Sequence, residues 1–254
     1  MPKKNTSWGN VAEWYDTHLS FDVNSFQKKV ILPNLLRLMT LSAKDHVLDL
    51  ACGQGFFTHE FAKSGADVTG LDISPELIAL AKKRFPSVHF ISAPADAISM
   101  VKTGTIDVVT LILAIQNIEN CRDVFVECFR IMKKTGRLYV VMNHPAYRIP
   151  KTSSWGFDAE AGIQYRRIDR YMSESRVEIE MHPGIKPTEK TLSFHRPLQY
   201  YFKLIGNLGG AVSRLEEWIS HKESERGPKK RAEDTSRKEI PLFLCLEVVH
   251  HKEV

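Results

Sequence analysis

Hydrophobic and polar positions follow two different periods along this chain. Between residues 46 and 142, short apolar stretches that indicate strands alternate with segments of helical spacing. This rhythm is typical of an α/β protein with a doubly wound, mostly parallel sheet. The strands are expected at 46–50, 67–71, 88–91, 106–112 and 137–142, and the helices at 56–63, 75–84 and 121–132.

The pattern changes on both sides of this region. Residues 8–40 have helical spacing that Pro33 interrupts, which predicts two helices or one kinked helix. After residue 143 the rhythm breaks, and alternation at 176–181 and 191–195 predicts an antiparallel pair inserted after the fifth strand. A helix at 197–208 and two final strands, at 211–219 and 240–250, would complete a seven-stranded sheet.

These segments predict a single domain with four parts. They are an N-terminal helical lid (1–42), a ligand-binding core (43–143), an inserted cap (144–196) and a C-terminal helix with strands (197–254). Within the last part, residues 221–239 are highly charged and have no large apolar side chain, so a mobile, solvated loop is predicted there. The alternative is that its lysines and arginines hold an anionic substrate or RNA.

Composition narrows the class of protein. The chain has 254 residues, 43% of them hydrophobic, which is enough for one substantial core, but it has no apolar run long enough for a membrane helix. No apolar segment follows the first lysines, so no signal peptide is expected. Four scattered cysteines favour reduced thiols and a cytoplasmic location. A net charge of +5, with acids and bases interleaved, selects no partner.

The stretch "VLDLACGQGFFTHEF", residues 47–61, is the most informative in the chain. A predicted strand leads into a turn with Gly53 and Gly55, which would let a ligand approach the backbone closely. Asp72 ends the next predicted strand, 19 residues after Gly53, where a carboxylate can accept hydrogen bonds from ribose hydroxyls. The spacing therefore indicates a ligand that contains a nucleoside.

Two residues near the turn bear on the charge of that ligand. Thr58 stands where a dinucleotide fingerprint has its third glycine, and Asp49 precedes the turn, where a carboxylate would repel a pyrophosphate. A carboxylate would instead attract a sulfonium or ammonium group. The turn thus favours S-adenosylmethionine, and a nucleotide oxidoreductase is the weaker alternative.

Four motifs at consistent separations carry a family resemblance. They are "LDLACGQG", the acidic "LDIS", "IDVVTLILAIQNIEN" and "MKKTGRLYVVMN", the last with Lys134-Thr135-Gly136 where K-P-G-G is usual. The chain resembles class I, Rossmann-like S-adenosylmethionine-dependent methyltransferases, a group that includes many small-molecule methyltransferases. The resemblance is closest over residues 40–143.

The resemblance implies which residues contact the cofactor. Positions around the end of the first strand would line the methionine part, and those after the second strand the ribose and adenine. Positions after the third strand would also contact the adenine, and those after the fourth strand would lie at the methyl-donor end. An N-terminal aromatic would close over the cofactor. The implied contacts are Asp49, Ala51, Gly53, Gly55, Asp72, Ile73, Asp96, Ala97, Leu113, Ala114, Ile115 and Tyr15.

The acceptor site is less clearly marked, because methyl transfer needs alignment of the reactants more than a fixed set of catalytic groups. His144 and Tyr147 follow the fifth strand and are the candidate catalytic residues, with His144 equally interpretable as a loop histidine that fixes backbone. Candidate substrate contacts are Gln116, Asn117, Trp155, Tyr165 and Arg167, although each aromatic could simply build the core of the insertion. No metal site is predicted, because His182 and His195 have no third ligand at a suitable spacing.

The expected function is therefore transfer of a methyl group to an O, N or C atom of a small organic substrate. The N-P-P-[YF] signature of adenine and glutamine methyltransferases is absent, and so is a basic aromatic platform for RNA. These absences favour a small molecule over nucleic acid and leave tRNA as an alternative. A catalytically silent protein that binds S-adenosylmethionine is a second alternative, and the oligomeric state stays open.

Overall fold

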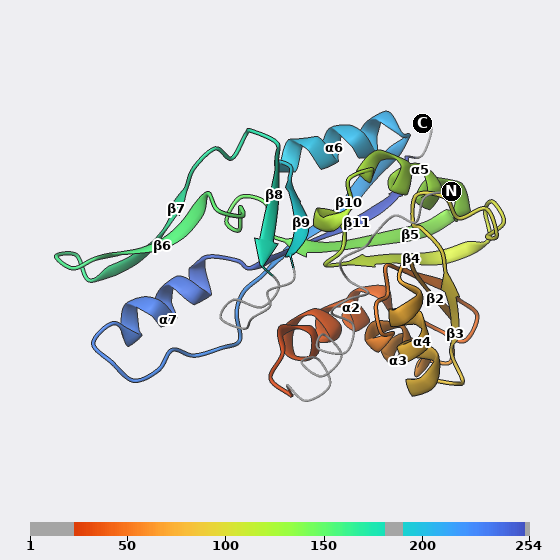
Figure 1. Ribbon diagram of the computed structural model, residues 1–254, viewed down its shortest axis with the longest axis horizontal. Helices are drawn as coiled ribbons and strands as arrows, with labels where there is room; N and C mark the ends of the chain where they lie inside the picture. The colour runs from red at the N-terminus through yellow and green to blue at the C-terminus, as the bar shows by residue number, and fades with distance from the viewer. Residues whose placement is uncertain (1–22, 181–189, 252–254) are drawn as a thin grey trace.

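A seven-stranded sheet organises the computed structural model, which describes residues 23–180 and 190–251. Its strand order is β10-β11-β5-β4-β1-β2-β3 (Figure 1). β11 runs antiparallel to β10 and β5, and the other neighbouring strands are parallel, so the predicted α/β fold with a mostly parallel sheet is confirmed. The strands are β1 (His46–Leu50), β2 (Asp67–Asp72), β3 (His89–Ser92), β4 (Ile106–Ile112), β5 (Met132–Asn143), β10 (Gly210–Trp218) and β11 (Phe243–His250).

Helices cover both faces of this sheet. In Figure 1, α2, α3 and α4 lie on one side, and α5 and α6 lie on the other. Each face of the sheet has its own hydrophobic core, and successive side chains of a central strand point to opposite faces. In β1, Val47 faces the α2–α3 side, whereas Leu48 and Leu50 face the α5–α6 side. The helical segments are η2 (Gln27–Ile31), α2 (Leu32–Met39), α3 (Phe56–Ala62), α4 (Pro75–Arg84), η3 (Ile115–Asn117), α5 (Cys121–Ile131), α6 (Leu198–Asn207) and α7 (Lys230–Glu239).

The helix interrupted by Pro33 is continuous but changes its hydrogen-bond pattern. Proline has no N–H, so the α-helical bond from position 33 to Lys29 cannot form. The preceding segment η2 is a wider π-helical turn, in which the N–H of Leu32 donates to the carbonyl of Gln27. Instead of the expected kink, the helix therefore changes locally from π-helical to α-helical hydrogen bonding.

The insertion after β5 contains two antiparallel hairpins, where the sequence pattern predicted one. The predicted pair corresponds to β8 (Ser175–Glu180) and β9 (Lys190–His195). A second pair, β6 (Ser153–Asp158) and β7 (Ile163–Ile168), projects away from the large sheet (Figure 1). Neither β6 nor β7 has a fully buried residue, so the alternation that reveals a strand in the sequence is weak here.

The expectation of a mobile loop over 221–239 is wrong for its second half, which forms the helix α7. Lys230 and Asp234 are one turn apart and lie 2.9 Å from each other, and Ser236 Oγ is 2.8 Å from Gln164 Oε1 on β7. Only Ser236 is buried in this helix. Since α7 is held by polar contacts, hydrophobic periodicity could not reveal it.

The described parts of the chain, 23–180 and 190–251, contain no helix with the length and apolar character required to span a membrane. This agrees with the absence of any long apolar run in the sequence.

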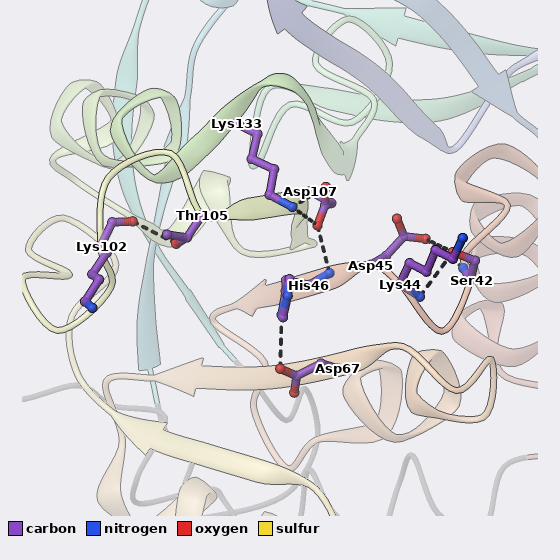
Figure 2. Close-up of polar contacts among 9 residues, drawn as sticks. All are labelled: Ser42, Lys44, Asp45, His46, Asp67, Lys102, Thr105, Asp107 and Lys133. Carbon is purple, nitrogen blue, oxygen red and sulfur yellow. Dashed lines mark hydrogen bonds and ion pairs between the residues drawn. The ribbon is translucent and has the colours of Figure 1, made fainter.

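Polar side chains link the strands at the amino end of the sheet. Asp107 in β4 accepts a hydrogen bond from the backbone N–H of His46 at 3.0 Å and from Lys133 Nζ at 2.8 and 2.7 Å (Figure 2). The His46 ring lies 3.1 Å from Asp67 at the start of β2. One carboxylate, that of Asp107, therefore connects the starts of β1, β4 and β5.

We predict that Asp107→Asn destabilises the protein by about 1–2 kcal/mol at pH 7 in urea unfolding. Burial raises the pKa of Asp107, but the bonds from Lys133 and His46 outweigh it and the pKa is lowered overall. A lowered pKa stabilises the fold above the unfolded value of about 3.9, and that contribution is lost as the pH falls through the folded pKa. The difference between native and variant protein should thus shrink below pH 4.

Asp67→Asn is the matched control, because the Asp67 side chain is 72% exposed and bonds only to the exposed His46 ring. It should change stability by less than about 0.5 kcal/mol. An equal cost for both variants, or a pH-independent cost for Asp107→Asn, would contradict the assignment.

Candidate functional site

A cavity of about 640 Å³ opens at the carboxyl ends of the parallel strands. We call it the large cavity. Its volume lies within the range of roughly 300–1,000 Å³ typical of small-molecule sites, and its position is where doubly wound sheets bind ligands. Residues after four consecutive parallel strands meet at its wall: Ala51, Gly53, Asp72, Ile73, Asp96, Leu113 and Ala114.

The turn after β1 adopts the backbone geometry that its glycines allow. Ala51, Gly53 and Gly55 all have positive φ, of 55°, 58° and 83°. Gly53 lines the large cavity, so ligand atoms could approach its backbone directly. Gly55 does not line it and instead caps α3, where an added Cβ would lie 2.6 Å from the Phe90 ring. The two glycines therefore have different roles, one facing the cavity and one allowing close packing.

Asp72 fixes this turn and also faces the large cavity. One carboxylate oxygen accepts from the N–H of Gly53 and the other from the N–H of Ser74, both at 2.9 Å. The side chain is mostly buried, and burial raises the pKa of Asp72 despite these bonds. A carboxylate has about four acceptor positions, so Asp72 can still accept a hydrogen bond from a hydroxyl group of a ligand.

Asp49 lies beneath the turn rather than at the cavity wall. Its oxygens accept hydrogen bonds from Thr58 and Thr110, each at 2.7 Å, and the residue is only 2% exposed. Burial raises the pKa of Asp49 to about 6, and the two hydroxyls oppose that rise. Thr58, which replaces a glycine of the dinucleotide fingerprint, is thus the partner of the buried acid.

The remaining predicted cofactor contacts separate into two groups. Ile73, Asp96, Leu113 and Ala114 lie at the wall as expected. Ile115 is fully buried away from the wall, and Ala97 is exposed outside it. Tyr15 lies outside the described residues, as does His182.

His144 does not face the large cavity, so the geometry favours the interpretation as a loop histidine. Its Nε2 lies 2.7 Å from Glu217, and its Nδ1 accepts from the N–H of Ala146 at 3.2 Å, which assigns the ring proton to Nε2. Burial lowers the pKa of His144, and Glu217 opposes that effect. Tyr147 packs beside this ring, with centroids 4.6 Å apart, and it too lies away from the cavity wall.

The predicted substrate contacts are only partly brought to the site. Asn117 lines the large cavity, and Gln116 lines a smaller neighbouring one. Trp155, Tyr165 and Arg167 instead lie on the β6–β7 hairpin, which extends away from the carboxyl ends of the sheet (Figure 1). There the guanidinium of Arg166 stacks on Trp155, and Arg167 pairs with Asp169 at 3.0 Å.

The part of the insertion that does reach the large cavity is β9. Thr191, Leu192 and Phe194 contribute to its wall, and Phe194 is nearly buried. The sequence predicted this strand as part of the inserted cap but did not indicate these three residues as contacts. Alternation places a strand in the chain, whereas its docking over the sheet depends on long-range contacts that one sequence does not reveal.

Arg196, at the end of β9, holds the loop that follows β4. Its guanidinium donates to the carbonyls of Ile115, Ile118 and Glu119 at 3.4, 3.0 and 2.8 Å, and the residue is 6% exposed. It also lies over the rings of Phe194 and Tyr200. Ile118 and Glu119 line the large cavity, so Arg196 positions one of its walls.

A second arginine, Arg130, holds the loop after β3 through hydrogen bonds to its backbone carbonyls. Arg130 donates to the carbonyls of Ile98 and Val101 at 2.9 Å each, and Glu127 accepts from the N–H of Ile98 at 2.7 Å. Arg130 and Glu127 also pair with each other at 2.7 Å. The sequence pointed to Arg196 only as a possible substrate contact and did not point to Arg130. The bonds of both arginines to backbone carbonyls could not be predicted, because such carbonyls leave no residue signature.

Comparison with known proteins agrees with this geometry. Residues 48–140 match a family model described as a methyltransferase domain. A demethylmenaquinone methyltransferase from Chlorobaculum tepidum is 29% identical over 135 residues, 52% of this chain and 55% of that protein. A ubiquinone biosynthesis O-methyltransferase from Xanthomonas oryzae is 27% identical over 129 residues, 47% of this chain and 54% of that protein. The chain spans about half the length of these curated relatives in the matched region.

A solved structure supports the same fold. An S-adenosylmethionine-dependent methyltransferase from Mesorhizobium loti superposes with a TM-score of 0.66 at 24% identity, covering 85% of this chain and 95% of that one. Residues 48–140 thus match a methyltransferase domain, and the chain has the class I, Rossmann-like fold. The resemblance inferred from the four motifs is confirmed.

We predict that Thr110→Val raises the pKa of Asp49 above its value of about 6, by roughly one unit, because one of two stabilising hydroxyls is lost. The folded pKa already exceeds the unfolded value of about 3.9, so folding favours the protonated acid. Stability should therefore decline as the pH rises from about 4 to 6, and in the variant the decline should extend further. Carboxyl ¹³C NMR titration measures the pKa directly.

Thr105→Val, at the opposite end of β4, is the control, since its hydroxyl bonds only to the carbonyl of Lys102. An unchanged Asp49 titration in Thr110→Val would show that the bond to Thr110 does not stabilise the ionised acid.

We predict that Arg196→Met speeds amide hydrogen exchange of residues 115–120 at least about 10-fold, because three carbonyls of this loop lose their donor. Arg196→Lys should recover little, since one ammonium cannot reach all three carbonyls. Arg214→Met, on the edge strand β10, should leave this loop unchanged. Equal exchange in Arg196→Met and the native protein would remove the positioning role.

Proposed function

We propose that this protein binds S-adenosylmethionine in the large cavity and transfers its methyl group to an O, N or C atom of a small organic molecule. The observation that carries the proposal is the pairing of Asp72 with Gly53 at the cavity wall of a methyltransferase domain. The turn and the carboxylate are locked together, as a site for a nucleoside requires.

The residues at the wall of the large cavity offer suitable contacts for each part of this cofactor. Asp72 can accept from ribose hydroxyls, and Ile73 and Leu77 offer apolar surface for adenine. The backbone of Gly53 leaves room for the methionine part. Asp96 and Glu119 also line the cavity, and Asp49 lies beneath the turn, so the surroundings favour a cationic ligand over a phosphate.

When bound, S-adenosylmethionine supplies a methyl group that its sulfonium has already activated. The work of the chain is then to bind, orient and exclude water, which are proximity effects. Leu113, Ala114 and Asn117 after β4, together with Phe194 from β9, would enclose the methyl-donor end. Of the described residues at the wall of the large cavity, none is a histidine, so the acceptor would reach its reactive form without a histidine base there.

The acceptor proposed here is a small molecule rather than nucleic acid. The two curated relatives are named for quinones, and residues of β9 form part of the cavity wall, so the site is a cavity rather than a flat platform. We also propose a cytoplasmic location, which is supported by four free cysteines, three of them buried.

We predict that Asp72→Asn weakens S-adenosylmethionine binding at least about 10-fold by isothermal calorimetry, because an amide accepts fewer hydrogen bonds and carries no charge. Asp67→Asn, at the other end of the same strand β2, should bind like the native protein. NADH should not compete. Native protein that binds NADH but not S-adenosylmethionine would reverse the assignment.

Radiolabelled methyl transfer into fractionated cell extract distinguishes an active methyltransferase from a catalytically silent protein that only binds S-adenosylmethionine. It also shows which class of molecule accepts the methyl group. Label in a small-molecule fraction, absent with Asp72→Asn, is the expected result. Label only in RNA would support the RNA methyltransferase. Tight cofactor binding without label in any fraction would favour a catalytically silent protein.

A further inference from the structure

A second cavity, of about 30 Å³, lies beside the large one at the carboxyl ends of β4 and β5. We call it the small cavity. Phe194 lines both cavities, and the polar side chains at the small one include Gln116, Asn143, Arg148 and Ser193. Because one water needs about 10–15 Å³ of such space, this cavity can hold a few polar atoms but not a whole organic molecule. The body of any molecule that uses it must lie elsewhere, and the large cavity is adjacent.

Gln116 leaves one buried atom without a partner at this position. Its Nε2 donates to the carbonyl of Leu113 at 2.9 Å, which fixes the orientation of the amide because a carbonyl can only accept. The Oε1 atom is then buried with no hydrogen-bond donor among the described residues. An unsatisfied buried acceptor costs about 1–3 kcal/mol, so a ligand hydroxyl or N–H that reaches it would be favoured.

Arg148, which is partly exposed to solvent, supplies a positive charge at the wall of the small cavity. Within residues 23–180 and 190–251, its guanidinium has no hydrogen bond or ion pair to a carboxylate, and it lies 5.9 Å from the Phe243 ring centroid. Its charged neighbour is Arg166, which bonds to the carbonyl of Tyr147 and the hydroxyl of Ser153. Burial and the charge of Arg166 lower the pKa of Arg148. Within the described part of the chain, neither Arg148 nor Arg166 is paired with a carboxylate, so together they favour binding of an anion next to the small cavity.

We propose that the methyl acceptor is a small organic acid, whose carboxylate pairs with Arg148 and whose hydroxyl or N–H donates to Gln116 Oε1. This rests on the proposed function, since it places the acceptor beside the methyl-donor end of the large cavity. The Gln116 amide is anchored on Leu113, which is itself at the wall of the large cavity. The acceptor's donor group would thus be oriented close to the methyl group, with the ring or chain of the acid against Phe194.

The test measures binding of the 2-, 3- and 4-hydroxybenzoates, each beside its primary amide, to protein saturated with S-adenosylhomocysteine. Acid and amide have nearly the same shape and differ in charge. For at least one pair, we expect native protein to bind the acid about 10-fold or more tightly than the amide by calorimetry. Arg148→Gln should abolish that preference, and Gln116→Leu should weaken the acid whose hydroxyl reaches Oε1.

Arg214→Gln is the matched control, because Arg214 is an exposed arginine on the edge strand β10, at the far side of β11. It should keep the native preference for the acid. Binding of S-adenosylhomocysteine, measured first for every variant, shows that the fold and the donor site are intact. If native protein fails to bind it, the proposed function fails and not merely the acid site.

Two results would overturn the inference while leaving the proposed function standing. One is a native protein, competent for S-adenosylhomocysteine, that binds no acid better than its amide. The other is a preference for the acid that survives Arg148→Gln. Either result would make the small cavity a hydration site, where a single water satisfies Gln116.

Discussion

The candidate site depends above all on the two hydrogen bonds that Asp72 accepts from the backbone. They join the turn after β1 to the start of the segment after β2, and the N–H of Cys52 reinforces the same junction by donating to the carbonyl of Leu71 at 3.0 Å. A turn with positive φ at Ala51 and Gly53 is costly to hold open by itself. The buried carboxylate offsets that cost, and its remaining acceptor positions face the cavity. One side chain thus both builds the site and belongs to it.

The two ends of the parallel sheet show how differently polar residues can be used. At the amino end, both carboxylate oxygens of Asp107 accept hydrogen bonds, from Lys133 and a backbone N–H, and Asp107 connects three strands (Figure 2). At the carboxyl end, polar groups such as Asp72 and Gln116 keep unused hydrogen-bonding capacity. Since buried polar groups are normally paired, the Oε1 atom of Gln116, which is unpaired among the described residues, indicates a position where a ligand completes the hydrogen bonding.

The sequence predicted the core of this fold because its signals are local. The strand at 46–50 and the helix at 75–84 matched their observed bounds, and the spacing from Gly53 to Asp72 placed both at one cavity. Contacts between distant, polar groups were not predictable. The helix α7 is held by polar contacts, Asp49 is satisfied by Thr58 and Thr110, and Arg196 bonds to carbonyls that have no sequence signature. His144 followed a strand as expected, but its partner Glu217 lies 73 positions away.

This difference explains why the sequence indicates the proposed methyl-donor site more clearly than the proposed acceptor site. The donor site is built from loops that directly follow β1, β2 and β4, so its residues keep a fixed spacing that short motifs can record. The proposed acceptor side includes β9, which lies over the sheet, and its geometry depends on Arg196, which donates to a loop about 80 positions earlier. A hairpin can be lengthened or redirected without disturbing the parallel strands, as β6–β7 shows by extending away from the site. The inserted hairpins are therefore where physical constraint from the fold is weakest, and where selectivity for one acceptor can change while the methyl-donor site stays intact.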